Sequence, residues 1–308
     1  MPFKRAVFEP RPFLMAVAGA PGAGKTYSAL RLATGLCSVL GGVPAVIDTE
    51  DRMGEEAGEF AFDLDVLGPP YTGRRFHERA QAAEAGGYKV LIIDNMSDEH
   101  EGEGGVLAQH DELERKSTSK AAKFSSWAEA KRDRMPLIRY LSRCRMNVIL
   151  TFRASQKTRL PTEAEKRQGA KDLIAMGWTP ICGLEYAYHT RLFAMLTPNC
   201  NGFPDWLSQD PGTEMVRKLP ERFKGLIDPQ AQLSEGMGAA MGRYLQRGGP
   251  EKSAELLSAL EAIGTAATLD ELASVRDRLR KQKWGRAGSR ELAEAFEQAT
   301  ERVRNGTV

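Results

Sequence analysis

The feature that most constrains this chain is the sequence Gly-Ala-Pro-Gly-Ala-Gly-Lys-Thr at residues 19–26, a complete Gly-x4-Gly-Lys-Thr phosphate-binding loop. In such a loop the glycines let consecutive backbone N–H groups converge on phosphate oxygens, and the following helix adds the positive end of its dipole. We expect Lys25 to reach the β- and γ-phosphates and the Thr26 hydroxyl to bind Mg²⁺. The predicted ATP site consists of Gly19, Ala20, Pro21, Gly22, Ala23, Gly24, Lys25, Thr26 and Tyr27.

The segments around this loop predict an α/β fold. Residues 13–18 are apolar, as in a buried strand, and residues 26–39 carry apolar side chains at helical spacing. Further strands are predicted at 44–48, 62–67, 88–94 and 147–152, and helices at 76–85 and 136–145. Strands that alternate with helices predict a mostly parallel, doubly wound sheet. For residues 184–196 we expect one long strand or a hairpin pair at the sheet edge.

The length of 308 residues allows one large α/β domain and a smaller appendage. Beyond residue 234 the composition shifts to Ala, Leu, Glu and Arg, with a break at Gly248-Gly249-Pro250. We therefore predict an ATPase domain over residues 1–230 and a helical C-terminal module over residues 235–308. The clearest helix of the module begins with a capping box at residues 268–271, and its basic outer face is either solvated or a contact for nucleic acid.

The bulk properties exclude several classes of protein. The net charge of +2 leaves any affinity for nucleic acid to local basic patches. The four cysteines form no Cys-x-x-Cys pair, which disfavours a zinc site or a disulfide framework. We find neither a signal-type segment nor an apolar run long enough to span a membrane, and so we expect a soluble, cytoplasmic protein with no membrane partner.

Two carboxylates at predicted strand ends suit ATP hydrolysis, which depends on positioning and on stabilisation of charge. Asp94 ends the strand Val-Leu-Ile-Ile-Asp, where it would bind Mg²⁺ together with Thr26. Asn95 follows it in place of a catalytic glutamate, so the acid that activates water must come from another strand. We predict that Glu50 is this general base, although residues 48–51 could instead be a simple acidic loop. Arg153, after a third strand, would sense the γ-phosphate or form an ordinary salt bridge.

These residues carry a resemblance. The segments GAPGAGKTYSALRLATGL, AVIDTED, VLIIDNMSDEHEGEGGVL and VILTFRA resemble phage-encoded ATP-binding proteins of the RecA-like class, often described as AAA-type ATPases of phage recombination modules. The resemblance covers about residues 13–195. It implies that the P-loop ATPase acts on single-stranded DNA in a phage-infected or lysogenic cell, forms homo-oligomeric rings or filaments, and works with phage recombination or replication proteins. Glu50 matches the position of the RecA-like catalytic glutamate, whereas Arg153 lies where recombinases usually carry glutamine.

Charge changes sign abruptly along the chain. Residues 94–114 contain acidic residues but no Lys or Arg, whereas residues 115–134 are mainly basic. A second basic stretch, residues 153–171, is predicted to be a mobile loop. Cations beside aromatic rings can neutralise phosphates while the rings stack on bases, although the acidic and basic blocks could also neutralise each other across a subunit contact. The predicted DNA-binding residues are Arg115, Lys116, Lys120, Lys123, Trp127, Lys157 and Arg159.

A shared nucleotide site would also need a cation from a neighbouring subunit, and Lys218 and Arg222 are the candidates. Two other functions remain open. One is a non-catalytic, ATP-gated scaffold of a DNA-processing complex, and the other is a small-molecule kinase, for which the chain lacks the usual arginine-rich lid.

Overall fold

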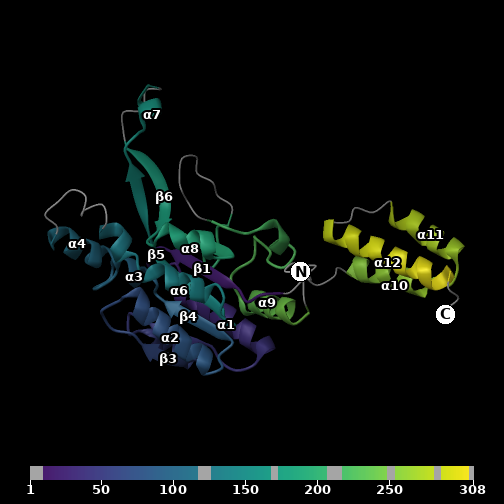
Figure 1. Ribbon diagram of the computed structural model, residues 1–308, viewed down its shortest axis with the longest axis horizontal. Helices are drawn as coiled ribbons and strands as arrows, with labels where there is room; N and C mark the ends of the chain where they lie inside the picture. Colours follow the sequence, from purple (N-terminus) through teal and green to yellow (C-terminus); the bar gives the residue numbers. More distant parts are fainter. Residues whose placement is uncertain are drawn as a thin grey trace, which may run out of the picture. The chain divides into compact units, whose positions relative to one another are not determined.

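The computed structural model describes residues 10–116, 126–167, 173–206, 217–247, 254–280 and 286–304 (Figure 1). Two compact units divide the chain, Met1–Gly249 and Pro250–Val308. The first unit is built on a seven-stranded sheet. Its strands are β1 (Leu14–Gly19), β2 (Ala45–Asp48), β3 (Asp63–Val66), β4 (Val90–Asp94), β5 (Asn147–Arg159), β6 (Ile174–Pro180) and β7 (Leu192–Leu196).

Six of these strands form a parallel sheet in the order β3-β2-β4-β5-β1-β7, which confirms the predicted α/β fold. The register pairs Asp48 with Asp94, and Gly19 with Arg153. Because the strands are parallel, their carboxyl ends meet at one edge, where ligands of such sheets bind. Strand β6 is different, since it runs antiparallel to the outer half of β5.

Helices cover both faces of the sheet. One face packs against α1 (Lys25–Leu40) and α9 (Glu235–Arg247), and its core includes Val17 and Ile92. The other face packs against α2 (Gly73–Ala85), α6 (Arg134–Leu141) and α8 (Leu184–His189), with Ala16 and Ile93 in the core. Neighbouring residues of one strand thus pack into opposite cores, which explains why the central strands β1 and β4 are apolar over nearly their whole length. The first unit also contains η1 (Met53–Gly58), α3 (Ser97–Glu101), α4 (Val106–Lys116), α7 (Glu163–Arg167) and η2 (Glu221–Phe223).

Helix α9 belongs to the first unit, so the domain boundary predicted at residues 230–235 is displaced. The helix lies directly on α1, and glycines allow the close approach. A Cβ at Gly35 would lie 2.0 Å from the Glu235 carbonyl oxygen, and one at Gly238 would lie 2.1 Å from the Leu32 carbonyl oxygen. The composition of α9 resembles that of the C-terminal helices, whereas its packing surface is specific to α1. The boundary therefore falls at Gly249.

Two other predictions of local structure are wrong. Residues 184–196 form helix α8 and then strand β7, and not one strand or a hairpin. The helix exposes Leu184 and Tyr188, one turn apart, and buries Tyr186 between them. Within the stretch 153–171 that was predicted to be a loop, residues 153–159 belong to strand β5, whose outer part pairs with β6, and residues 163–167 form α7; residues 168–171 lie outside the described part of the chain. We call residues 154–159 and 174–180 the arm; it projects from the sheet and carries α7 beyond it (Figure 1).

The second unit contains α10 (Ala254–Thr265), α11 (Leu269–Leu279) and α12 (Arg286–Arg304), around a core that includes Ile263, Leu272 and Phe296. Thr268 caps the helix as predicted, since its Oγ1 atom accepts a hydrogen bond from the Glu271 N–H group, whereas the Glu271 carboxylate accepts from the N–H group of Ala267 at 2.7 Å and not from that of Thr268. The Arg276 guanidinium lies 4.9 Å from the ring centre of Phe296, so part of the basic face packs within the unit. Among the residues that the structure describes, no helix has the length and apolar character of a membrane span.

Candidate nucleotide-binding site

The phosphate-binding loop connects β1 to α1 in the conformation that its glycines require. Gly22 and Gly24 have φ angles of 70° and 80°, which side-chain-bearing residues rarely adopt. Gly19 is needed for space, because a Cβ there would lie 2.8 Å from the Leu196 carbonyl oxygen. The first turn of α1 follows at once, with the Ser28 N–H group bonded to the Gly24 carbonyl oxygen at 2.9 Å. The loop thus presents N–H groups at a helix N-terminus, as phosphate binding requires.

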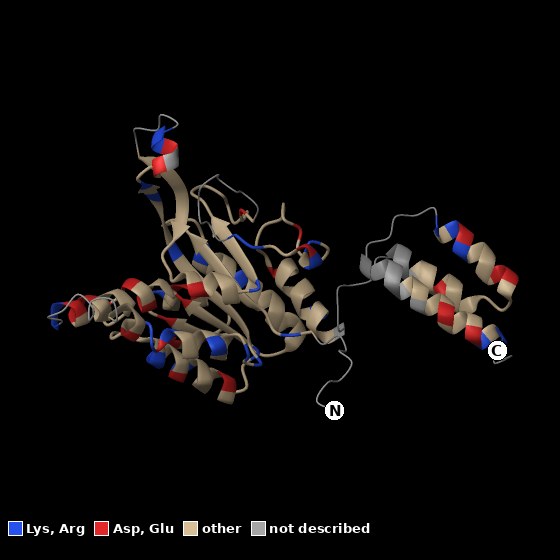
Figure 2. Ribbon diagram, turned by 45° about the horizontal axis from the view of Figure 1, so that its top comes forward, with Lys and Arg blue, Asp and Glu red and all other residues tan. Residues whose placement is uncertain are grey.

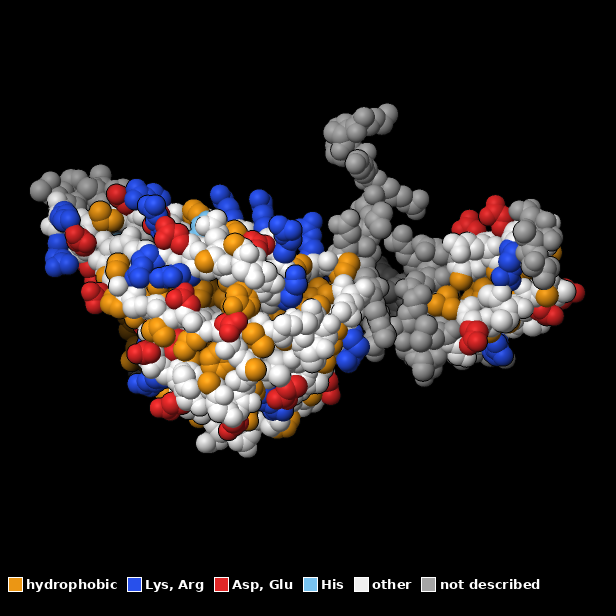
Figure 3. Space-filling model, turned by 90° about the horizontal axis from the view of Figure 1, so that it is seen from below, with side chains coloured by type: hydrophobic (Ala, Val, Ile, Leu, Met, Phe, Trp, Pro, Cys, Tyr) orange, Lys and Arg blue, Asp and Glu red, His pale blue; other side chains and the backbone are white. Residues whose placement is uncertain are grey.

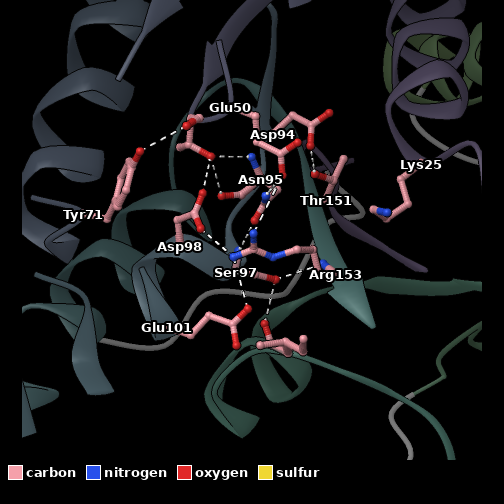
Figure 4. A network of polar contacts seen from close by, with 12 residues as sticks. Lys25, Glu50, Tyr71, Asp94, Asn95, Ser97, Asp98, Glu101, Thr151 and Arg153 are labelled. Carbon is pink, nitrogen blue, oxygen red and sulfur yellow. Dashed lines mark hydrogen bonds and ion pairs between the residues drawn. The ribbon is translucent and has the colours of Figure 1, made fainter. Parts of the chain in front are cut away.

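Lys25 and Thr26 begin helix α1. The Lys25 side chain points toward Thr151 at the carboxyl edge of the sheet (Figure 4). The Lys25 ammonium donates a 3.0 Å hydrogen bond to the Ala20 carbonyl oxygen. Burial lowers the pKa of Lys25, while the negative charges of Asp94 and Glu50 oppose this effect. The cation therefore lies between the loop and the two predicted catalytic carboxylates.

Asp94 is buried and accepts hydrogen bonds from two hydroxyl groups, one from Thr26 and one from Thr151 on the neighbouring strand β5. Burial raises the pKa of Asp94, although both hydroxyls favour its ionised form. The adjacent Thr26 and Asp94 supply the hard oxygen ligands that suit Mg²⁺. In the described part of the chain no three His, Cys, Asp or Glu side chains are grouped to hold a metal alone, so phosphate oxygens would have to complete such a site.

Glu50 follows β2 and faces the same edge. Its Oε1 atom accepts a 2.5 Å hydrogen bond from the Asn95 side-chain amide, while its side chain remains 38% exposed. The Asn95 Oδ1 atom in turn accepts from the Ser97 N–H group at 2.9 Å. Glu50 is thus oriented by a neighbour and still accessible to water, two properties that a general base needs.

Asp48 is a residue whose role the sequence analysis missed. Its buried carboxylate accepts 2.8 Å hydrogen bonds from the N–H groups of Glu50, Arg52 and Met53. These three hydrogen bonds to one carboxylate close the loop after β2 and hold the backbone of Glu50 in place. An aspartate that precedes a short polar turn is the sequence signal for such a loop-organising role. The acidic loop therefore has a defined conformation, in which Asp48 holds the backbone and Glu50 presents its carboxylate at the site.

Arg153 is the last residue of β5 that pairs with β1, and its guanidinium contacts several acids. Its Nη2 atom lies 2.6 Å from Asp98 and 3.1 Å from Glu101, and its Nη1 atom lies 3.9 Å from Glu50 (Figure 4). Its backbone N–H group bonds to Ser97 Oγ at 2.9 Å. The salt bridges foreseen as the alternative to γ-phosphate sensing are thus present, at a position next to the candidate base.

A cavity of about 240 Å³ opens between the first turn of α1 and η1. Thr26 and the carboxylates of Glu50 and Asp94 line it, so the groups predicted to bind Mg²⁺ and to activate water face one space. The remaining lining residues are Asp48, Arg52, Met53, Glu55 and Glu56. Tyr27 lies next to this region, with its ring edge against Phe60 and its hydroxyl 3.2 Å from Glu59.

The predicted DNA-binding residues that the structure describes lie on separate segments of the chain: Arg115 and Lys116 in α4, Trp127 ahead of α6, and Lys157 and Arg159 in β5. On the face in Figure 3, described basic, acidic and hydrophobic side chains are interspersed. Arg115 and Lys116 are exposed at the end of α4, where Lys116 pairs with Glu112 at 2.6 Å. One face of Trp127 is covered by the His110 ring, with centroids 3.9 Å apart. Lys120 and Lys123 lie outside the described residues.

On the arm, Lys157 is exposed, whereas Arg159 is held by both oxygens of Glu165. Figure 2 shows that α7, beyond the arm, carries both signs of charge. The candidate trans-acting cations also have partners in their own chain. Lys218 Nζ donates to the Thr190 carbonyl oxygen at 2.7 Å, and the Arg222 guanidinium lies 4.8 Å from the ring centre of Phe223.

Comparison of the sequence with models of known protein families identifies one family that matches the chain. The family model described as an AAA domain matches residues 11–176, which include the phosphate-binding loop, Glu50, Asp94 and Arg153. No curated protein sequence matches the chain significantly. AAA domains are nucleotide-binding ATPases that typically use Mg²⁺, in agreement with the donor groups of the site. Because the match covers more than half of the chain and the parallel sheet agrees with it, the protein belongs to the AAA domain family of P-loop ATPases.

Proposed function

We propose that the protein hydrolyses ATP at this site, with Glu50 as general base and with Mg²⁺ held by Thr26 and Asp94. The observation that carries the proposal is the orientation of Glu50 by Asn95 at the cavity that Thr26 and Asp94 also line. Lys25 would neutralise the transferred phosphate, and Arg153 would respond to its charge. In this mechanism the fixed Glu50 carboxylate would activate the attacking water, and the phosphate-binding loop would stabilise the negative charge on the transferred phosphate.

We further propose that single-stranded DNA is the ligand that stimulates hydrolysis, in phage recombination or replication. Two features support this choice. The arm and the end of α4 carry exposed cations, including Lys157 and Arg115, and the sequence resembles RecA-like ATPases. We also propose a homo-oligomer, a ring or a filament, in which Lys218 or Arg222 would act on the nucleotide of a neighbouring subunit.

The test is ATP turnover by the full chain with and without single-stranded DNA over a salt series. We expect turnover that requires Mg²⁺, rises with DNA and loses its DNA stimulation as salt increases, because counterion release makes phosphate contacts salt-dependent. ATP binding without turnover would identify the scaffold and reject the hydrolase. Phosphoryl transfer to a small acceptor in place of water would identify a kinase. Turnover without any response to DNA would reject the DNA ligand alone.

A further inference from the structure

A buried hydroxyl group on helix α3 contacts both strands of the arm at the point where the arm leaves the sheet. Ser97 Oγ accepts a 2.9 Å hydrogen bond from the Arg153 N–H group and donates a 2.8 Å hydrogen bond to the Ile181 carbonyl oxygen. The Ile181 N–H group completes the junction with a 2.7 Å bond to the Arg153 carbonyl oxygen. Ser97 is fully buried, so water does not compete for these bonds. Its hydroxyl therefore bridges the two arm strands where they leave the sheet.

The same serine is connected to Glu50 through one intermediate residue. The Ser97 N–H group donates to Asn95 Oδ1 at 2.9 Å, and Asn95 Nδ2 donates to Glu50 Oε1 at 2.5 Å. The amide group of Asn95 is planar, so its two hydrogen bonds cannot be reoriented independently. Asn95 itself is 1% exposed, which leaves its side chain little room to turn. A shift of Ser97 would consequently redirect the donor that holds the candidate base.

We propose that Ser97 is a positioning residue that couples the spacing of the two arm strands to the orientation of the Glu50 carboxylate. The inference rests on the proposed function, because it concerns the rate of hydrolysis at that site. Arg153 gives the coupling a second connection, since its backbone pairs with Ile181 while its guanidinium reaches Asp98, Glu101 and Glu50. A change in the arm would alter turnover through these two connections without touching the phosphate-binding loop.

Helix α3 does not depend on the Ser97 hydroxyl for its place. Glu99 on this helix forms a buried ion pair with Arg134 of α6, with Nη2 and Oε2 2.8 Å apart and both side chains fully buried. Asp98 accepts a 2.6 Å hydrogen bond from Thr49 Oγ1. With these anchors in place, removal of one hydroxyl should loosen the arm junction while leaving the helix folded. The substitution Ser97→Ala therefore isolates the coupling.

The experiment compares Ser97→Ala with Ser38→Ala, which removes a hydroxyl bonded to a carbonyl oxygen at 2.8 Å near the far end of α1. For Ser97→Ala we expect kcat to fall about tenfold, because the substitution removes the two hydrogen bonds of the Ser97 hydroxyl. The KM for ATP should stay within about twofold of the wild-type value. Amide exchange in residues 154–159 should accelerate, and Ser97→Thr, which keeps the hydroxyl, should recover most of kcat. A lower melting temperature with unchanged kcat would show a merely structural role and overturn the proposal.

A second measurement needs no variant and therefore does not depend on how Ser97→Ala folds. Hydrogen exchange of the wild-type chain is followed with and without Mg²⁺ and a non-hydrolysable ATP analogue. We expect the rates at Arg153 and Ile181 to change at least about threefold, with no change in α11. Analogue binding without a response at the arm junction would refute the coupling. Absence of ATP turnover by the wild-type chain would instead refute the proposed function, so the two failures are distinguishable.

Discussion

The Asn95 side-chain amide donates a 2.5 Å hydrogen bond to the Glu50 carboxylate, although the two residues follow different strands. The register that pairs Asp48 with Asp94 brings the ends of β2 and β4 together and so makes this contact. Because Asn95 Oδ1 accepts from the Ser97 N–H group, its NH₂ group must face Glu50. The residue after Asp94 thus orients an acid supplied by the neighbouring strand.

Substitution of Lys25 should weaken nucleotide binding. Lys25 lies between the loop and the carboxylates, where charge-assisted hydrogen bonds to phosphate are worth about 1.5–3 kcal/mol each. For Lys25→Ala we expect the Kd for ATP, measured by titration calorimetry, to rise at least about tenfold. Lys89→Ala, at the opposite end of β4 and exposed, is the control. Equal affinity in the two variants would mean that the loop binds phosphate without this lysine.

Asp94→Asn should stabilise the protein while it impairs Mg²⁺-dependent nucleotide binding. Burial raises the pKa of Asp94 in the folded chain. The folded state therefore binds the proton more tightly than the unfolded state, and stability is lost as pH rises through the unfolded and then the folded pKa. Without Mg²⁺ at pH 7, the variant should melt at a higher temperature than wild type, and the difference should shrink in acid. Asp51→Asn, at an exposed loop position with φ of 52°, should melt as wild type. A lower melting temperature for Asp94→Asn would contradict the assignment of a desolvated carboxylate.

His100 should contribute to the loss of stability in acid. Burial and the neighbouring Arg134 lower its pKa from 6.5 to about 4, and Arg134 Nη2 lies 3.0 Å from His100 Nδ1. Between these two pH values the unfolded chain binds a proton that the folded chain does not, so the free energy of unfolding decreases as pH falls from 6.5 to about 4. In urea titrations, His100→Gln should flatten this dependence. A slope in His100→Gln as steep as that of the wild type would argue against a neutral, buried imidazole.

The arm offers a matched pair of cations for DNA binding. Lys157 is exposed, whereas the Arg159 guanidinium is engaged by both oxygens of Glu165. In anisotropy titrations with single-stranded DNA, Lys157→Ala should weaken binding and reduce the salt slope by about 0.7–1, the contribution of one phosphate contact. Arg159→Ala should have a smaller effect, because its charge is already neutralised. A larger effect of Arg159→Ala would show that the ion pair opens on DNA binding.

The parallel sheet could be predicted because β1 and β4, which are buried on both faces, are apolar over nearly their whole length, and because β2 and β4 end in aspartates. The same signal located Asp94 and Glu50. Helix α8 was mistaken for a strand because its six residues, Leu184–His189, are too few to separate the helical period from the strand period. The helix is stabilised by burial of the Tyr186 ring, whose centre lies 5.3 Å from that of Phe152. This contact forms only in the folded protein, so the local sequence does not reveal it.

Other features depend on contacts between residues distant in sequence. The three N–H groups that bond to Asp48 and the bridging hydroxyl of Ser97 become apparent only when the backbone is folded. The same is true of α9, whose place against α1 depends on two glycines that remove the barrier to close approach. Local pattern therefore identified the acids of the site, whereas tertiary contacts determine how those acids are held.

The most direct test of the account is the rate of ATP hydrolysis by Glu50→Gln. This substitution keeps a side chain of the same shape but removes the proton acceptor, so ATP affinity should stay within about threefold of wild type while kcat falls by about 10²-fold or more. Glu59→Gln, a similar change of an exposed residue after η1, serves as the control. Retained ATP binding with hydrolysis lost only in Glu50→Gln is the predicted result. Wild-type turnover by Glu50→Gln would contradict the assignment of Glu50 as the base.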